Sequence, residues 1–280
     1  MKIGMNLYLW LTKLEPQHFE LLAKLKHLGF DGVEIPTGDY TTKELANIRN
    51  ALNNEDLKCT VATLLSPEVN PISPDSAIRA AARDKLQHDI NIASELGSEA
   101  LIGPMHSGHK LFYDRGPNQQ EVDLCTEFLA AMGTEAKQAN LLLGVEPLNR
   151  FECYFLNTAA QGKQLVDAVN LDNVGILYDT HHANIEEYNV YDAITGLGNR
   201  LNHFHISESH RGSPGTGAVD WRNSFKALKD MNYKGWLVIE SFAKDVEGFP
   251  EAVNIWRDCF NSKDEVVAKG LALIQHQLAN

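Results

Sequence analysis

Several features that mark common protein classes are missing from this sequence. Its 25 lysines and arginines form no basic run and are outnumbered by 37 aspartates and glutamates, which gives a formal net charge of −12. This charge repels phosphate backbones and anionic membrane surfaces, so we expect neither nucleic acid nor membrane partners. No apolar segment approaches the roughly 20 residues that span a bilayer, and the N-terminus shows no signal-peptide pattern.

Cysteine is also scarce, which limits the redox and metal chemistry that the sequence supports. The four cysteines are Cys59, Cys125, Cys153 and Cys259, and no two of them form a C-x-x-C pair. This spacing argues against a disulfide framework and against a zinc cluster. We therefore expect reduced thiols in or near a protein core, and a cytoplasmic location.

The main positive signal is a series of short apolar runs separated by longer amphipathic segments. The runs do not alternate cleanly between apolar and polar residues, so they are typical of strands that are covered on both faces, as in a parallel sheet. Eight such runs are present, at residues 2–6, 32–35, 59–63, 100–103, 141–146, 174–179, 201–206 and 236–240.

The segments between the runs have helical spacing. Val122, Cys125, Leu129 and Met132, for example, fall on one helix face. Eight strand–helix units predict an α/β protein, a single-domain (β/α)8 TIM barrel over residues 1–280 with a closing C-terminal helix at 264–278. A doubly wound open sheet is the alternative, but no G-x-G-x-x-G turn follows the first run.

Four of the runs end on a side chain that can bind a metal. Glu146, Asp179, His205 and Glu240 lie at or near the ends of the fifth to eighth runs. Pro147 favours an extended conformation at Glu146 and so ends that strand at the carboxylate. Because the C-terminal ends of parallel barrel strands meet at one mouth, we expect the four side chains to converge there.

Taken singly, each of these four residues is better explained as a solvated acid or a satisfied core histidine. Four in succession after strands of one sheet favour a shared site. Three carboxylates in a partly buried mouth repel one another, and a divalent cation removes that repulsion. Three carboxylate oxygens and one imidazole nitrogen suit Mn²⁺, with Mg²⁺ or Co²⁺ as alternatives, better than a structural zinc ion.

Further polar residues follow these strand ends, and their spacing supports two interpretations equally. Glu152, His182 and Arg211 lie where they could contact a polyhydroxylated substrate, or Arg211 could pair with a surface acid. We expect His181 to face solvent. Among the tryptophans only Trp10, in the loop after the first strand, is placed for a pocket, since barrel aromatics usually belong to the core.

The stretches that carry these residues resemble one known family. They read GVEPLNRFECYFLNT, DTHHANIEE, HFHISESHRGSPGTGAVDW and GWLVIESF. Their order and separations resemble those of the ketose 3-epimerases of the D-tagatose and D-psicose type, within the xylose-isomerase-like barrels. The resemblance covers nearly the whole chain and is most specific from Glu146 to Phe242.

The resemblance implies a site and a reaction. It implies four metal ligands, Glu146, Asp179, His205 and Glu240, of which the two glutamates double as the acid/base pair. Three further positions match sugar contacts, namely Glu152, His182 and Arg211. In the implied reaction one glutamate removes the C3 proton of a free ketose, a cis-enediolate forms, and the other glutamate returns a proton to the opposite face. A homodimer or homotetramer is also implied.

Two stretches depart from the family pattern. Family members carry aromatic residues in the loops after the first and fourth strands, where this chain has Asn6 and the more polar residues 105–109. The sequence therefore leaves the identity of the sugar open. The loop at 211–217 could seat a small anion, although it has no P-loop pattern.

Three other functions compete with the epimerase. An aldose–ketose isomerase of the same superfamily, of the hydroxypyruvate or tetrulose type, would use the same acid/base pair to move a proton between C1 and C2. A barrel-fold DNA-repair endonuclease would need more histidines and a basic groove, which an acidic chain does not favour. A sugar-binding protein has no need for opposed carboxylates around a metal.

Overall fold

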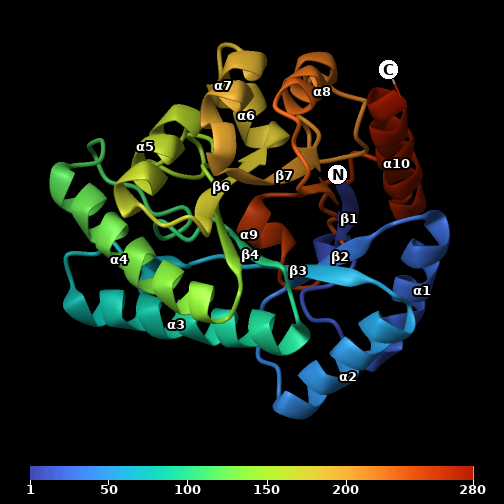
Figure 1. The fold of residues 1–280 in the computed structure, drawn as a ribbon, viewed down its shortest axis with the longest axis horizontal. Coiled ribbons are helices and arrows are strands. Elements are labelled where there is room, and N and C mark those ends of the chain that lie inside the picture. Colours follow the sequence, from blue (N-terminus) through green and yellow to red (C-terminus); the bar gives the residue numbers. More distant parts are fainter. Residues whose placement is uncertain (280) are drawn as a thin grey trace.

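Eight parallel strands close on themselves in chain order to form a barrel, in a computed structural model that describes residues 1–279 (Figure 1). Each of the eight predicted runs overlaps one strand, which confirms the predicted TIM-barrel fold. The strands are β1 (Lys2–Asn6), β2 (Gly32–Pro36), β3 (Lys58–Ala62), β4 (Ala100–Gly103), β5 (Leu142–Val145), β6 (Val174–Asp179), β7 (Leu201–Ser207) and β8 (Trp236–Glu240).

Helices surround the barrel on its outside (Figure 1). The α-helices are α1 (Phe19–Leu28), α2 (Thr42–Asn54), α3 (Ser76–Leu96), α4 (Gln119–Gln138), α5 (Ala159–Val169), α6 (Thr180–Glu186), α7 (Val190–Leu197), α8 (Trp221–Asp230), α9 (Pro250–Val253) and α10 (Lys263–Ala279). Short 3₁₀ helices are η1 (Leu7–Leu9), η2 (Pro16–His18), η3 (Pro67–Val69) and η4 (Gly198–Arg200). The expected closing helix at 264–278 is α10.

Local sequence signals explain where the main helices begin and end. The side chain of Asp75 accepts a hydrogen bond from the backbone of Ala77, so α3 starts at the predicted Ser-Pro-Asp signal. Capping boxes open α2 at Thr41 and α4 at Asn118. At Gly29 the backbone φ is 98°, a left-handed conformation that ends α1 before β2.

The strand register brings the residues at the C-terminal strand ends together. All residues of β2, β4, β6 and β8 are buried, as expected for strands that pack against helices outside and against side chains inside the barrel. Asp179 on β6 pairs directly with His205 on β7, and Ser207 pairs with Glu240 on β8. Three of the four predicted ligands therefore lie on adjacent strands at the same end of the barrel.

No helix within residues 1–279 has both the length and the apolar character that are needed to cross a bilayer.

Candidate active site

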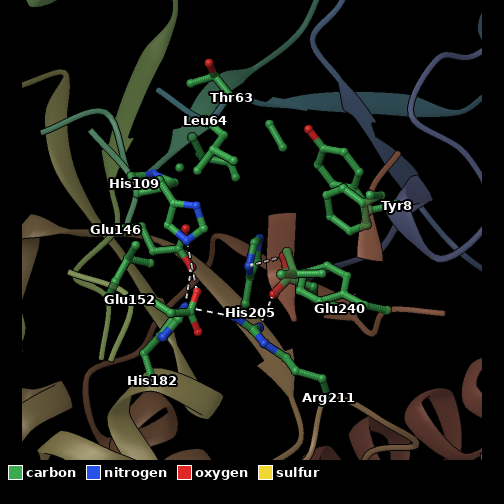
Figure 2. A pocket seen from close by; sticks show the side chains of 18 residues that line it. Tyr8, Thr63, Leu64, His109, Glu146, Glu152, His182, His205, Arg211 and Glu240 are labelled. Atoms are coloured by element: carbon green, nitrogen blue, oxygen red, sulfur yellow. Dashed lines mark hydrogen bonds and ion pairs between the residues drawn. The ribbon is translucent and has the colours of Figure 1, made fainter. Parts of the chain in front are cut away.

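A cavity of about 520 Å³, counted with its open mouth, lies at the C-terminal end of the barrel. Glu146, His205 and Glu240 line it together with the predicted sugar contacts Glu152, His182 and Arg211 (Figure 2). The structure thus places these predicted residues around one space, where a small polar molecule fits.

The four predicted metal ligands form two overlapping groups. Potential ligand atoms of Asp179, His205 and Glu240 all lie within 4.8 Å of one another, as do those of Glu146, Asp179 and His182. His205 Nδ1 is 3.3 Å from Glu240 Oε1 and 3.6 Å from Asp179 Oδ2. Asp179 belongs to both groups, so the four side chains converge as predicted, and His182 lies beside them.

His205 offers an unpartnered nitrogen to these carboxylates. Its Nδ1 is buried and has no hydrogen-bond partner, whereas its Nε2 lies 2.9 Å from Glu34 Oε1 on β2. Asn6 donates to the same Glu34 oxygen over 2.9 Å and to Glu240 Oε1 over 3.2 Å. A carboxylate that receives the Nε2 proton leaves the Nδ1 lone pair facing Asp179 and Glu240, which is how a metal-binding histidine is commonly oriented.

Arg211 supplies the positive charge at the centre of this arrangement. Its Nη1 donates to Asp179 Oδ2 over 2.8 Å and also to Glu240 Oε2, and its Nη2 lies 2.8 Å from His182 Nε2. The side chain is buried, so the interpretation as a partner of a surface acid is wrong. The backbone φ of Arg211 is 59°, a left-handed conformation that is uncommon outside glycine and often marks a functional site.

A second polar chain links the remaining predicted sugar contacts. Asn149 donates its backbone N–H to His182 Nδ1 over 3.1 Å and its side-chain amide to Glu152 Oε1 over 2.9 Å. The other oxygen of Glu152 lies 3.2 Å from His109 Nε2. Burial, together with the charge of Arg211, lowers the pKa of His182 to about 3, so His182 is neutral.

Burial and mutual repulsion disturb the titration of the three clustered carboxyls. Burial raises the pKa of Glu146 well above its ordinary value, and the charges of Asp179 and Glu240 add to the rise. Burial likewise raises the pKa of Glu240, although His205 and Arg211 oppose it. At Asp179 burial is outweighed, chiefly by Arg211, and the pKa falls well below its usual range. The two raised pKa values reflect the cost of ionising three carboxyls together in one buried space.

The loop at 211–217 does not offer a free anion site. The buried carboxylate of Glu208 accepts backbone N–H groups from Gly215 over 2.8 Å and from Val219 over 3.3 Å, and the Trp221 indole N–H over 3.2 Å. These donors hold the chain's own carboxylate, so the expectation of a small-anion seat is wrong. Their effect is to fix the loop that carries Arg211.

Two expectations about single residues are corrected. Trp10 does not line the cavity and instead packs, partly buried, against the hydrophobic core, whereas Tyr8 lines the cavity and stacks on Phe249 with ring centroids 4.3 Å apart. The short helix η1 turns the chain after β1, and this turn decides which aromatic residue faces inward. His181 is partly buried, and its Nδ1 lies 3.1 Å from the backbone oxygen of Glu208, so it does not simply face solvent.

Sequence reasoning missed three residues that support the site. Glu34 holds His205, Asn6 bridges Glu34 and Glu240, and His106 Nε2 lies 3.0 Å from the backbone oxygen of Glu146. Burial lowers the pKa of His106 to about 4, so its ring is neutral. One signal was available, because Glu34 is a charge inside the apolar run GVEIP, where a lone acid needs a partner.

Comparisons with known proteins agree with this geometry. Residues 22–259 match the family model of the xylose isomerase-like TIM barrel. The chain is 32% identical over 275 residues to the D-psicose 3-epimerase of Agrobacterium fabrum, covering 94% of this chain and 93% of that protein. It is 31% identical to the ketose 3-epimerase of Arthrobacter globiformis, covering 99% and 97%. A solved structure of an L-ribulose 3-epimerase superposes with a TM-score of 0.94 at 29% identity, covering 99% and 94%.

Proposed function

Because this chain belongs to the xylose isomerase-like TIM barrel family, within which it groups with the ketose 3-epimerases, we propose that it inverts C3 of a free ketose in a metal-dependent reaction. The chain is an isomerase-class enzyme. The proposed reaction proceeds by proton transfer through a cis-enediolate between two glutamates. Similar proteins are named D-psicose 3-epimerase and L-ribulose 3-epimerase. For this chain we propose a free ketose as the class of substrate and do not single out one sugar.

The pair of glutamates in one cavity is the observation that carries the proposal. Glu146 follows β5 and Glu240 ends β8, so the two carboxyls reach the cavity from different sides of the barrel (Figure 2). Asp179 and His205 lie on the two strands between them. Asp179 groups with both glutamates, and His205 groups with Asp179 and Glu240. An inversion needs a proton removed from one face of a carbon and another delivered to the opposite face, and this layout provides a group for each.

The residues present fit a divalent cation. The unpartnered Nδ1 of His205 and the oxygens of Asp179 and Glu240 would hold it, with Glu146 as the fourth ligand. This oxygen-rich set supports Mn²⁺, with Mg²⁺ and Co²⁺ as alternatives. When bound, the cation supplies Lewis-acid polarisation of the C2 carbonyl and a template for two sugar oxygens.

The chain's own residues bind the sugar, shield it and move the proton. One of Glu146 and Glu240 takes the C3 proton, and the other gives a proton back from the opposite face. Arg211 donates to sugar oxygens through N–H groups that Asp179 and Glu240 leave free, and Glu152 accepts from hydroxyls. Phe242 and Phe249 line the cavity with apolar rings, which would exclude water from the reacting carbon. We further propose a homodimer or homotetramer, which the family resemblance implies, and a cytoplasmic location, which the few cysteines without a C-x-x-C pair favour.

A panel of free ketoses from tetrulose to hexulose tests the proposal. Each sugar is incubated with Mn²⁺ or with a chelator, and the products are identified by NMR. We expect C3 epimers of one or more ketoses, in the presence of Mn²⁺ only. Formation of an aldose as the sole product would instead assign the protein to the aldose–ketose isomerases, and turnover that survives complete chelation would contradict the metal dependence.

A further inference from the structure

One part of the cavity wall, formed by the loops after β1, β3 and β4, has few polar side chains. Tyr8, Thr63 and His109 are the polar residues that these loops place there. Thr63 Oγ1 donates to the buried Asp89 Oδ2 over 2.6 Å, so its proton is already used. Within residues 1–279, the Tyr8 hydroxyl and the His109 Nδ1 have no hydrogen-bond partner. These two atoms are therefore available to a ligand.

His109 is held firmly in place. Its Nε2 lies 3.2 Å from Glu152 Oε2, its backbone N–H donates to Leu65 over 2.8 Å, and the next residue, Lys110, donates its N–H to the backbone oxygen of Glu152 over 3.0 Å. The residue is only 9% exposed. Figure 2 shows its ring above Glu146 and Glu152, across the cavity from Tyr8. With Nε2 held by Glu152 and the backbone bonded to Leu65, the ring presents its second nitrogen in one direction.

The bond to Glu152 also decides what His109 offers to a ligand. Burial by itself would raise the pKa of Glu152, but the hydrogen bond with His109 and the nearby positive charge hold it below its usual range, so the group is an ionised carboxylate. An ionised carboxylate only accepts hydrogen bonds, so the proton of the imidazole sits on Nε2. In the neutral ring Nδ1 then carries a lone pair and acts as an acceptor.

We propose that His109 is a specificity residue, whose Nδ1 accepts a hydrogen bond from a sugar hydroxyl that takes no part in the proton transfer. The inference rests on the proposed function for the class of ligand, a free ketose. A hydroxyl satisfies the Nδ1 lone pair, whereas a methyl or methylene group at that position leaves it unpartnered.

The same feature selects against a phosphorylated sugar. Arg211 is the only lysine or arginine among the described residues that line the cavity, and Asp179 and Glu240 already engage it. A phosphate near His109 would meet an acceptor nitrogen and the Glu152 carboxylate, neither of which donates a proton to it. Rejection of the wrong ligand by repulsion is a common source of specificity.

The test compares one ketose with its own deoxy and phosphorylated derivatives. Dissociation constants and kcat/KM are measured with Mn²⁺ for a ketohexose, its 1-deoxy and 6-deoxy analogues, and its 1- and 6-phosphates. The variant is His109→Phe, which keeps a ring of similar size and removes both nitrogens. We expect the wild type to prefer the parent sugar over one deoxy analogue by about 10-fold, and the variant to lose that preference.

Controls separate a specific effect from a folding defect. His27→Phe makes the same exchange at an exposed position in the last turn of α1 and leaves the preference unchanged. If His109→Phe does not fold by circular dichroism, His109→Leu takes its place, because its apolar side chain also lacks an acceptor.

Each outcome decides between the proposals. If the preference for the parent over the deoxy sugar, in dissociation constant and kcat/KM, is the same in wild type and variant, the proposed role of His109 is wrong. A wild-type preference for a sugar phosphate would also overturn that role. Both outcomes leave the epimerase proposal intact. A second outcome is that no C3 epimer forms, but His109→Phe still changes the ratio of the dissociation constants of the deoxy and parent sugars. This outcome overturns the proposed reaction and supports the role of His109 in binding. If no ketose binds, both proposals fail.

Discussion

The two halves of the barrel mouth are built differently. At the ends of β6 to β8 the polar side chains are buried and bonded to one another, with Arg211 joining Asp179 to Glu240. At the ends of β1 and β4, within residues 1–279, few polar atoms lack a partner, chiefly the Tyr8 hydroxyl and the His109 Nδ1. We call the side formed by the ends of β5 to β8 the charged half and the side formed by the loops after β1, β3 and β4 the neutral half. We propose that the strand ends hold a charged centre for the chemistry, while the neighbouring loops select the ligand.

Removal of either acid/base group should have the largest effect. Glu146→Gln or Glu240→Gln keeps the side-chain size but cannot take a proton, so we expect kcat for C3 epimerisation to fall by about 100-fold or more. The rate is followed by NMR or chromatography of the two epimers. Glu95→Gln, on the exposed surface of α3, is the matched control and should retain full activity. If either site variant keeps the wild-type kcat, the glutamate changed in it is not an acid/base group, and the proposed mechanism is wrong.

Loss of His205, the histidine among the proposed metal ligands, should remove the response to metal. Mn²⁺ at 100 times its dissociation constant should raise the free energy of unfolding of the wild type by about 2.7 kcal/mol. His205→Ala should lose most of this gain, because the imidazole that faces Asp179 and Glu240 is gone. Thermal melts with Mn²⁺ and with chelator measure the effect, and His27→Ala is the control. If the melting temperature of the wild type is the same with Mn²⁺ and with chelator, the proposed metal site is contradicted.

A residue behind the site should matter less than a ligand. Glu34→Gln replaces the carboxylate that fixes His205 Nε2 by an amide that can also donate, so the ring loses its fixed tautomer. We expect Mn²⁺ to bind about 10- to 100-fold more weakly, as measured by calorimetric titration. Glu20→Gln, exposed in the first turn of α1, should leave the affinity unchanged. Equal affinities of wild type and Glu34→Gln would show that Glu34 serves the fold only.

The smallest effect should come from the neutral half. Tyr8→Phe removes one hydroxyl but keeps the stacking on Phe249, so we expect KM to rise by about 3-fold, the size of one neutral hydrogen bond, with kcat nearly unchanged. Steady-state kinetics on the preferred ketose measure both constants, with Tyr191→Phe on the outer helix α7 as the control. A large fall in kcat would instead show that the Tyr8 hydroxyl takes part in the reaction, and the two halves would then not have separate roles.

The charged half was predictable because its signals are local in the sequence. Glu146, Asp179, His205 and Glu240 each lie at or near the end of an apolar run, and only one assumption, a closed parallel barrel, was needed to bring them together. Helix starts such as Asp75 were equally local, since a capping side chain bonds the backbone of its own first turn. Their roles as ligands and acids stay predictions until measured.

The neutral half could not be predicted, because its contacts depend on how loops turn. Trp10 was expected in the pocket, but the 3₁₀ turn after β1 brings Tyr8 there instead. The contact between His109 and Glu152 joins the loops after β4 and β5, and no spacing in the sequence shows it. Glu34 was visible as a lone charge in a strand, yet its partner His205 lies on a strand that does not neighbour β2.

The central claim is that a ketose passes its C3 proton to one glutamate and receives another proton from the opposite glutamate. Incubation of the protein with its ketose and Mn²⁺ in D₂O, followed by NMR of the product, tests this most directly. The account predicts a C3 epimer that carries deuterium at C3 and none at C1. An epimer without deuterium at C3, or an aldose labelled at C2, would contradict it.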